Sequence, residues 1–261
     1  MFFESIVRIT IIMKNINSII SIGAAFILGT GAGWIVKGKN IDYLFSHYLP
    51  AIATLLAAYF GAKFAFDFQR NKEKHDQKNK NRVSGNLAIF KLVAMLNSLL
   101  SYQKQIIEPV RTKPTAFLEM IPTLPQVQDH ISIDIDSLSF LLDTNDENLI
   151  GELSVEVARY KAAIEAINDR SRVHRSEAQP TLAASDIKNG GDCSLEEIQN
   201  VLGERLFHTL DNSTNQVIHH VDSTILSLND LAGKLSKSLK KQFPKERIIS
   251  LLNPKDEENT N

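Results

Sequence analysis

The sequence predicts an all-α protein in which an N-terminal two-helix transmembrane hairpin precedes a cytoplasmic antiparallel helical bundle with coiled-coil-like seams. Residues 15–36 carry no charge, and residues 41–62 carry only Asp42, at their outer end. About 20 apolar residues in a helix cross the hydrocarbon core of a bilayer, so each stretch is long enough to span it. Later in the chain, apolar residues recur at alternating steps of three and four, the pattern of packed helices.

We expect the chain to be organised in seven segments. The transmembrane hairpin covers residues 1–68, with spans at about 15–36 and 41–62, and a basic juxtamembrane run that continues as a helix covers 69–108. The remaining segments are a Pro-rich irregular segment at 109–136, a helical segment at 137–179, a linker at 180–193, a long helix at 194–243 and a flexible tail at 244–261.

The charges that flank the two spans predict the orientation of the hairpin. The short gap between the spans holds Lys37 and Lys39 beside Asp42. The second span is followed by a richer basic run, made up of Arg70, Lys72, Lys74, Lys78, Lys80 and Arg82. Because positive charge resists translocation, both termini are expected on the cytoplasmic side of a bacterial inner membrane, in a multi-pass topology.

Two other interpretations of the N-terminus remain open. Residues 15–36 could be a secretory signal peptide, cleaved near Thr30, Gly31 and Ala32, although the apolar run is longer than a usual signal core. Met13, directly before Lys14, could also be the true start of translation. Either alternative leaves the second span and the cytoplasmic remainder in place.

Small residues recur every four positions on each span and predict close helix packing. The two ridges consist of Ala25, Gly29 and Gly33 on the first span and of Ala53, Ala57 and Gly61 on the second. Such ridges let helix backbones approach closely inside a bilayer. They could pack the first span against the second, or they could join copies of the chain into a homo-oligomer.

Three helical patterns follow the hairpin. Val83, Leu87, Phe90 and Ala94 recur at steps of four and three, with Leu92, Leu96 and Leu99 beside them, so the helix of the second span is expected to continue from Pro50 towards Pro109. The next two patterns are typical of bundle seams, and they consist of Ile150, Leu153, Val157, Tyr160, Ile164 and Ile167, and of Val217, Val221, Thr224, Leu228, Leu231 and Leu235. Ser194 and Glu197 resemble a capping box that opens the last helix.

Catalytic and cofactor motifs are missing from the sequence, so we expect no enzyme activity, no cofactor and no metal site. Phosphate-binding glycine loops that follow a strand, metalloprotease motifs and nucleophile elbows do not occur. Cys193 is the single cysteine and cannot form an internal disulfide. His208 and His219 share a helix face but stand about 16 Å apart by helical rise, too far for one metal ion.

The basic residues have an interpretation that needs no nucleic acid. The run from Arg70 to Arg82 is explained by topology, because it lies directly after the second span. Residues 234–247 are also basic, whereas residues 115–170 are acidic, so these two segments could meet within one bundle. The chain as a whole carries a net charge of −1. Direct binding of nucleic acid is therefore not expected.

The organisation resembles the small two-span membrane effectors of bacterial anti-phage systems, including those of retrons. The resemblance rests on the paired spans 15–36 and 41–62, the basic run 70–82 and the helices that follow, as an architecture without a sequence motif. It implies a toxic membrane protein that a cytoplasmic protein or ribonucleoprotein partner keeps silent and that disrupts the membrane on release. The alternative is a membrane-tethered scaffold or regulator that recruits a cytoplasmic partner through its bundle.

Overall fold

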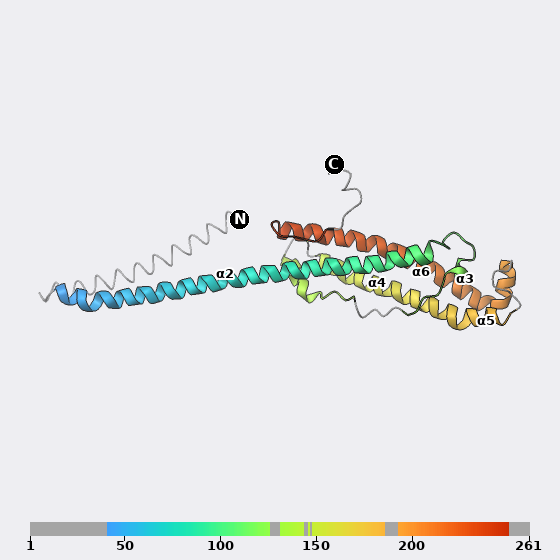
Figure 1. Cartoon of the computed structure of the whole chain (residues 1–261), viewed down its shortest axis with the longest axis horizontal. Coiled ribbons are helices and arrows are strands. Elements are labelled where there is room, and N and C mark those ends of the chain that lie inside the picture. The colour runs from blue at the N-terminus through green and yellow to red at the C-terminus, as the bar shows by residue number, and fades with distance from the viewer. Residues whose placement is uncertain (1–40, 126–130, 144–145, 147, 186–192, 251–261) are drawn as a thin grey trace, which may run out of the picture. The chain divides into compact units, whose positions relative to one another are not determined.

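A computed structural model describes residues 41–125, 131–143, 146, 148–185 and 193–250 of the chain (Figure 1). These residues form helices and irregular segments, and none of them lies in a β-strand. The chain divides into two compact units, Met1–Lys72 and Glu73–Asn261. The prediction of an all-α fold is confirmed for the described residues.

Helix α2, Ile41–Tyr102, contains the predicted second span and continues into the second unit. Pro50 lies inside this helix but does not end it. Thr54 Oγ1 donates a hydrogen bond of 2.7 Å to the Pro50 carbonyl. A bond of this kind satisfies a hydroxyl where water is absent. The predicted first span at 15–36, and with it the pairing of the hairpin, lies outside the described residues.

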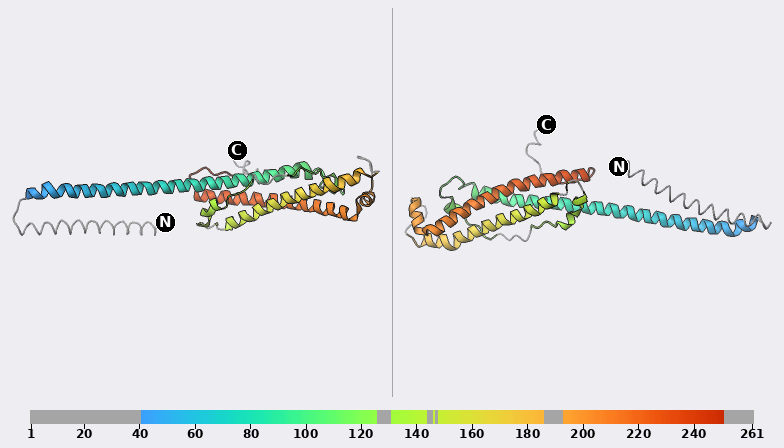
Figure 2. Two further views of the ribbon diagram at one scale, coloured as in Figure 1. Left: turned by 90° about the horizontal axis from the view of Figure 1, so that it is seen from below. Right: turned by 180° about the vertical axis from the view of Figure 1, so that it is seen from behind.

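The second unit is built on three long helices, the C-terminal part of α2, α4 (Asn148–Val173) and α6 (Leu195–Gln242). Glu152 of α4 pairs with Lys234, and Arg170, later in α4, bonds Thr214, so α4 and α6 are antiparallel. Gly85 of α2 lies against Leu239, and Gln103, just after α2, bonds Asp222, so α6 is antiparallel to α2 as well. It follows that α2 and α4 run in the same direction (Figure 2).

The parallel arrangement of α2 and α4 requires a connection that returns along the whole bundle. A π-helical turn, η1 (Gln103–Ile107), ends α2, and two short helices follow, α3 (Ala116–Glu119) and the 3-10 helix η3 (Asp136–Asp143). Pro122 and Pro125 lie between α3 and η3, where they disfavour helix and favour extended backbone. The predicted irregular segment 109–136 is thus wrong at α3, while the alternating residues 131–135 form no strand.

The core lies where the three long helices meet. Ile89, Leu92 and Leu99 of α2 are fully buried there, together with residues of both other helices. Burial of both predicted seams confirms them: the α6 seam from Val217 to Leu235 is buried throughout, and the α4 seam is buried apart from half-buried Ile150 and Val157. Apolar burial of about 25 cal/mol per Å² is the main stabilising term of such a bundle.

The far end of the bundle has a smaller second core around Phe117, Leu202 and Leu206. Here α4 continues through the π-helical turn η4 (His174–Ala178) into α5 (Gln179–Ala183). Because Pro180 lies in the first turn of α5, where proline is tolerated, the predicted linker 180–193 is wrong at its start.

Helix α6 begins as predicted but is not continuous. Ser194 and Glu197 form the capping box, with the Ser194 side chain accepting from the Glu197 backbone and the Glu197 side chain from the Ser194 backbone. Gly203 then interrupts the helix with φ 75° and ψ 153°, a conformation that is strained for any residue with a Cβ. The prediction of one unbroken helix over 194–243 is therefore wrong at Gly203.

The segment after α6 is held in place as far as Ile249, which corrects the prediction of a flexible tail from 244. The Asn86 side chain donates to the Arg247 carbonyl (3.1 Å) and accepts from the Ile249 amide (3.0 Å). Ser236 Oγ donates to the Ile249 carbonyl at 2.8 Å. These bonds satisfy backbone groups that lie outside any helix.

Candidate functional site: the exposed apolar section of α2

The section of α2 between Pro50 and Phe68 presents large apolar side chains that no described residue covers. Every side chain from 53 to 80 is exposed. Leu55 is 71% exposed and Phe68 is 74% exposed, and the same surface includes Leu56, Tyr59, Phe60, Phe64 and Phe66. An apolar surface of this extent on a soluble protein marks contact with a membrane or with another protein.

Aromatic rings contact one another along this section. The ring centroids of Tyr59 and Phe60 are 5.6 Å apart in an edge-on arrangement, and those of Phe60 and Phe64 are 6.3 Å apart and stacked. Tyr59 also carries a hydroxyl. These contacts lie within one helix and leave its outer surface free to meet lipid or another helix.

Among the described helices, α2 is the one that is long and apolar enough to cross a membrane. Its most apolar stretch has a mean hydropathy of 1.5 and is 39% buried. From Pro50 onwards, the first buried residue of α2 is Gly85, so this stretch reaches into the bundle. Hydropathy therefore does not distinguish the two halves of α2, whereas exposure does.

The small-residue ridge predicted on the second span lies on this exposed section. Ala53, Ala57 and Gly61 are all exposed. A Cβ placed on Gly61 would meet no atom within 4 Å, so no described element packs against the ridge. The matching ridge of Ala25, Gly29 and Gly33 lies outside the described residues.

The basic run that follows is exposed along most of its length. Arg70, Lys72, Lys74, Lys78 and Lys80 are exposed, and the boundary between the two units falls within this run, after Lys72. Arg82 differs, because it is half-buried and its Nε lies 3.8 Å from Glu246 Oε2. Arg82, predicted as a juxtamembrane residue, thus also contributes to the bundle.

A polar network ties the end of α2 to α6. Arg111 donates two hydrogen bonds to the Asp222 carboxylate, at 2.7 and 2.9 Å, and Gln103 donates a third at 2.7 Å. These hydrogen bonds, those from Arg111 first, lower the pKa of Asp222. The bidentate geometry fixes both distance and orientation between the returning connection and α6.

A fully buried arginine lies between the two cores. Arg170 donates from Nη2 to the Phe117 carbonyl at 2.9 Å and from Nε to Thr214 Oγ1 at 3.2 Å, while Nη1 has no partner among the described residues. Burial lowers the pKa of Arg170 to about 10. A buried guanidinium bound only by neutral oxygens is costly, so its contacts to the returning connection have to be well formed.

His174, one turn after Arg170, makes a second bond to the same connection. Its Nε2 donates to the Leu118 carbonyl at 3.0 Å, and burial lowers its pKa. Ser171 Oγ accepts from the Thr123 backbone at 3.2 Å. Arg170, Ser171 and His174 were not predicted from the sequence. They continue the α4 seam beyond Ile167, and polar residues at seam positions could have indicated them.

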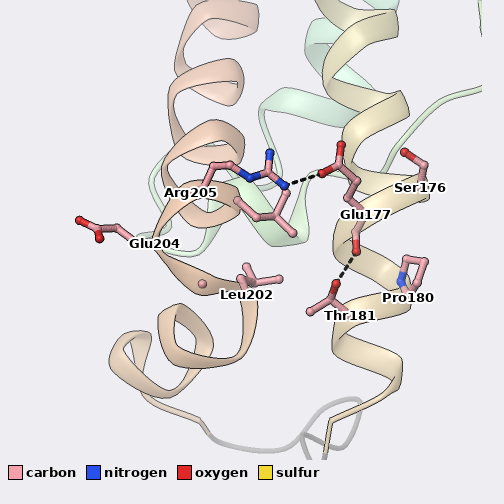
Figure 3. Close-up of a pocket in the computed structure, with 9 residues that line it drawn as sticks. Ser176, Glu177, Pro180, Thr181, Leu202, Glu204 and Arg205 are labelled. Carbon is pink, nitrogen blue, oxygen red and sulfur yellow. Dashed lines mark hydrogen bonds and ion pairs between the residues drawn. The ribbon is translucent and has the colours of Figure 1, made fainter.

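The surface of the bundle is recessed in places. One recess, about 520 Å³, lies beside the break at Gly203 and is lined by residues of η4, α5 and α6 (Figure 3). Across it, Arg205 Nη2 pairs with Glu177 Oε2 at 3.0 Å, and Thr181 donates to the Glu177 carbonyl at 2.7 Å. The recess is open, and the charges of Arg205 and Glu177 neutralise each other across it, while Glu204 points away from this pair (Figure 3).

A second recess, about 320 Å³, lies at the start of α4 and is lined by Lys234, Lys237 and Lys241 of α6. Lys234 pairs with Glu152 at 2.9 Å and with Asp230 at 3.0 Å. The acidic middle and the basic end of the chain thus meet within the bundle at this point. Among the described residues, no three His, Cys, Asp or Glu side chains are grouped to hold a metal ion.

Comparisons with protein-family models, with curated proteins and with solved structures found no match for this chain. Two features of the chain bear most on its function: the exposed apolar section of α2 and the helical bundle.

Proposed function

We propose that the chain is a non-enzymatic protein of a bacterial inner membrane, anchored by the apolar section of α2 and carrying its bundle in the cytoplasm. The exposure of seven large apolar side chains between Leu55 and Phe68 carries this proposal. Complete burial of one such side chain is worth about 1.5–3 kcal/mol. Transfer of this section into hydrocarbon removes an apolar surface that no described residue covers.

The basic residues after the apolar section support the cytoplasmic position of the bundle. Lys72, Lys74 and Lys78 are exposed and would have to be dehydrated for the bundle to cross the membrane. With residues 15–36 as a second span, the protein is multi-pass and both termini are cytoplasmic.

Within this topology, we propose an effector that disrupts the membrane when a cytoplasmic protein or ribonucleoprotein partner releases it, in an anti-phage defence system. The ridge of Ala53, Ala57 and Gly61, which no described residue covers, supports this activity, because small residues allow helices of several copies to pack closely in lipid. The resemblance to two-span effectors points in the same direction.

The second candidate is a membrane-tethered scaffold or regulator. It is favoured by the bundle, whose core is formed entirely by described residues of the second unit. In this case the spans act only as an anchor, and the bundle surface recruits the partner.

Expression in a bacterial host distinguishes the two candidates. Cells are induced tightly and followed with a membrane-potential dye and an impermeant DNA stain, for the full chain and for a chain lacking residues 1–68. A third chain carries an unrelated two-span anchor in place of residues 15–66. Depolarisation before growth arrest with the full chain alone supports the effector.

The opposite results have equally direct meanings. Activity that persists with the unrelated anchor contradicts the effector and supports the scaffold. A full chain that is released from membranes by alkaline carbonate contradicts membrane anchoring, and both candidates fail with it.

A further inference from the structure

An apolar row lies on the outer face of α2, within the bundle unit and opposite the core. Val83 is 51% exposed, Leu87 is 49% exposed and Phe90 is 61% exposed. Ala94, half-buried, continues the row. We refer to Val83, Leu87, Phe90 and Ala94 as the outer row.

Helical geometry shows that the outer row and the core belong to opposite faces of α2. At about 100° per residue, the four members of the outer row lie within about 60° of one another. Fully buried Ile89 and Leu92 lie roughly 120° to 180° around the helix from the centre of the row. The bundle therefore uses one apolar face of α2 and leaves the second without a partner among the described residues.

The other exposed apolar residues of the long bundle helices do not form such a row. Leu226 of α6 is 73% exposed and Val155 of α4 is 54% exposed, and each is the only large exposed apolar side chain among the described residues of its helix apart from Leu195 at the start of α6. Single exposed apolar residues are normal on protein surfaces, whereas a contiguous row indicates a contact.

The spacing of the outer row is that of a two-helix coiled coil. The steps of four, three and four residues are those of a heptad seam. The same register continues towards the N-terminus through Lys80 and Asp76. These two residues are charged and exposed, so the seam passes from apolar to polar positions there.

We propose that the outer row pairs with the outer row of a second copy of this chain, in parallel and in register. In that arrangement identical residues of the two copies face each other at every seam position, so Asp76 faces Asp76 and Lys80 faces Lys80 at the polar end of the seam. Glu73, the next seam position, would likewise face Glu73 of the second copy, and these like charges limit close pairing to the outer row, residues 83–94.

The proposal rests on the proposed membrane anchoring. Copies that are anchored in one membrane by the same helix share one orientation, so their α2 helices can only pair in parallel. Confinement to the membrane also raises the effective concentration of the copies, which lets a short seam of four apolar residues suffice.

Cysteine cross-linking of the full chain in membranes tests the pairing. Cys193, the only cysteine, is replaced by serine, and a single cysteine is introduced as Leu87→Cys or Phe90→Cys. Identical positions meet in a parallel in-register pair, so mild oxidation should convert most of the chain into disulfide-linked dimer. The matched control Leu226→Cys, at an isolated exposed position, should yield at least several-fold less.

A charge in the row provides a second test that leaves the core intact, because Phe90 is 61% exposed. Phe90→Glu places two carboxylates opposite each other in the seam and should reduce the Leu87→Cys cross-link several-fold. Lys80→Leu removes the two facing ammonium groups and extends the apolar seam by one position, so it should increase the cross-link.

The remaining outcomes overturn the proposal in distinct ways. If the cysteine at position 87 is alkylated rapidly and does not cross-link, the outer row is exposed to solvent and unpaired. If it is neither alkylated nor cross-linked, a different chain segment or partner covers the outer row. Carbonate extraction of the same membranes reports anchoring separately, so failure of the pairing and failure of the proposed function give different results.

Discussion

The two halves of α2 are similar in apolar content but differ in how much of their apolar surface is buried. Between 83 and 102, Leu92 and Leu99 lie on the face that forms the core and are fully buried, while the outer row lies on the opposite face. Between 50 and 68, the seven large apolar residues from Leu55 to Phe68 are distributed around more than half of the helix circumference, and all are exposed. An apolar face that packs in a core specifies a bundle helix, whereas an apolar surface around much of the helix is typical of a fully buried helix or of a membrane span.

The comparison also explains why the most apolar stretch of α2 is not a reliable guide to the span. Hydropathy counts side chains without regard to the face on which they lie, and the bundle half of α2 is rich in leucine because it forms a core. The distribution of apolar residues around the helix is the property that separates the two environments.

Removal of a core side chain should produce the largest effect and should be specific to the bundle half. Leu92→Ala deletes a fully buried side chain and is expected to lower the free energy of unfolding by about 2–5 kcal/mol. Leu55→Ala, on the exposed half of the same helix, should change it by less than about 0.5 kcal/mol. Urea unfolding of the full chain in detergent, followed by circular dichroism, measures both; equal losses would contradict the division of α2.

A charge in the exposed half should have the converse effect. Ala57→Arg is expected to cost about 2.5–3.5 kcal/mol of membrane insertion and to leave bundle stability unchanged. Ala158→Arg, at an exposed position of α4, is the control and should not affect insertion. The fraction of chain that resists carbonate extraction measures the difference, and retention of Ala57→Arg at the level of the control would place the span elsewhere.

Local and periodic features of the bundle could be predicted from the sequence. The two seams and the capping box at Ser194 were predicted correctly, because each depends on residues that are close in sequence. For the candidate site, the sequence located the apolar section and the basic run, and the structure adds that no described residue covers the ridge from Ala53 to Gly61.

Features that depend on distant contacts could not be predicted. The break at Gly203 gives no signal, because a glycine inside a helical pattern is usually tolerated. Arg170 is buried only because the Phe117 carbonyl, far away in sequence, reaches it. Asn86 orders residues 247–249 across an even longer separation, so a segment that the sequence predicts to be flexible is held in place.

Two glycines of α2 sharpen the comparison at a smaller energy scale. A Cβ on Gly85 would lie 2.7 Å from two methyl carbons of Leu239, which is itself buried, so Gly85→Ala should overpack the α2–α6 contact. Overpacking costs about 1–3 kcal/mol, and the better helix propensity of alanine returns up to about 1 kcal/mol, so a net loss of about 1 kcal/mol is expected.

Gly61→Ala is the matched control, because its Cβ meets no atom within 4 Å. It should leave unfolding of the bundle unchanged, again measured with urea. A stabilising effect of Gly85→Ala would show that Leu239 moves away freely and that the contact between α2 and α6 is looser than the structure indicates.

The smallest effect concerns pH and arises only in the bundle. Burial lowers the pKa of His174, so between its usual value of about 6.5 and its lower value in the folded state the unfolded chain binds more protons than the folded one. The free energy of unfolding should therefore fall as pH decreases from about 6.5, by at most about 1.4 kcal/mol per pH unit.

His174→Gln keeps a donor for the Leu118 carbonyl and should flatten the decline between about pH 6.5 and 5, above the range where carboxylates titrate. His208→Gln, which removes an exposed imidazole, should retain it. A decline that survives His174→Gln would mean that protonation of His174 does not open the contact between α4 and the returning connection, and that another group of the bundle senses the pH.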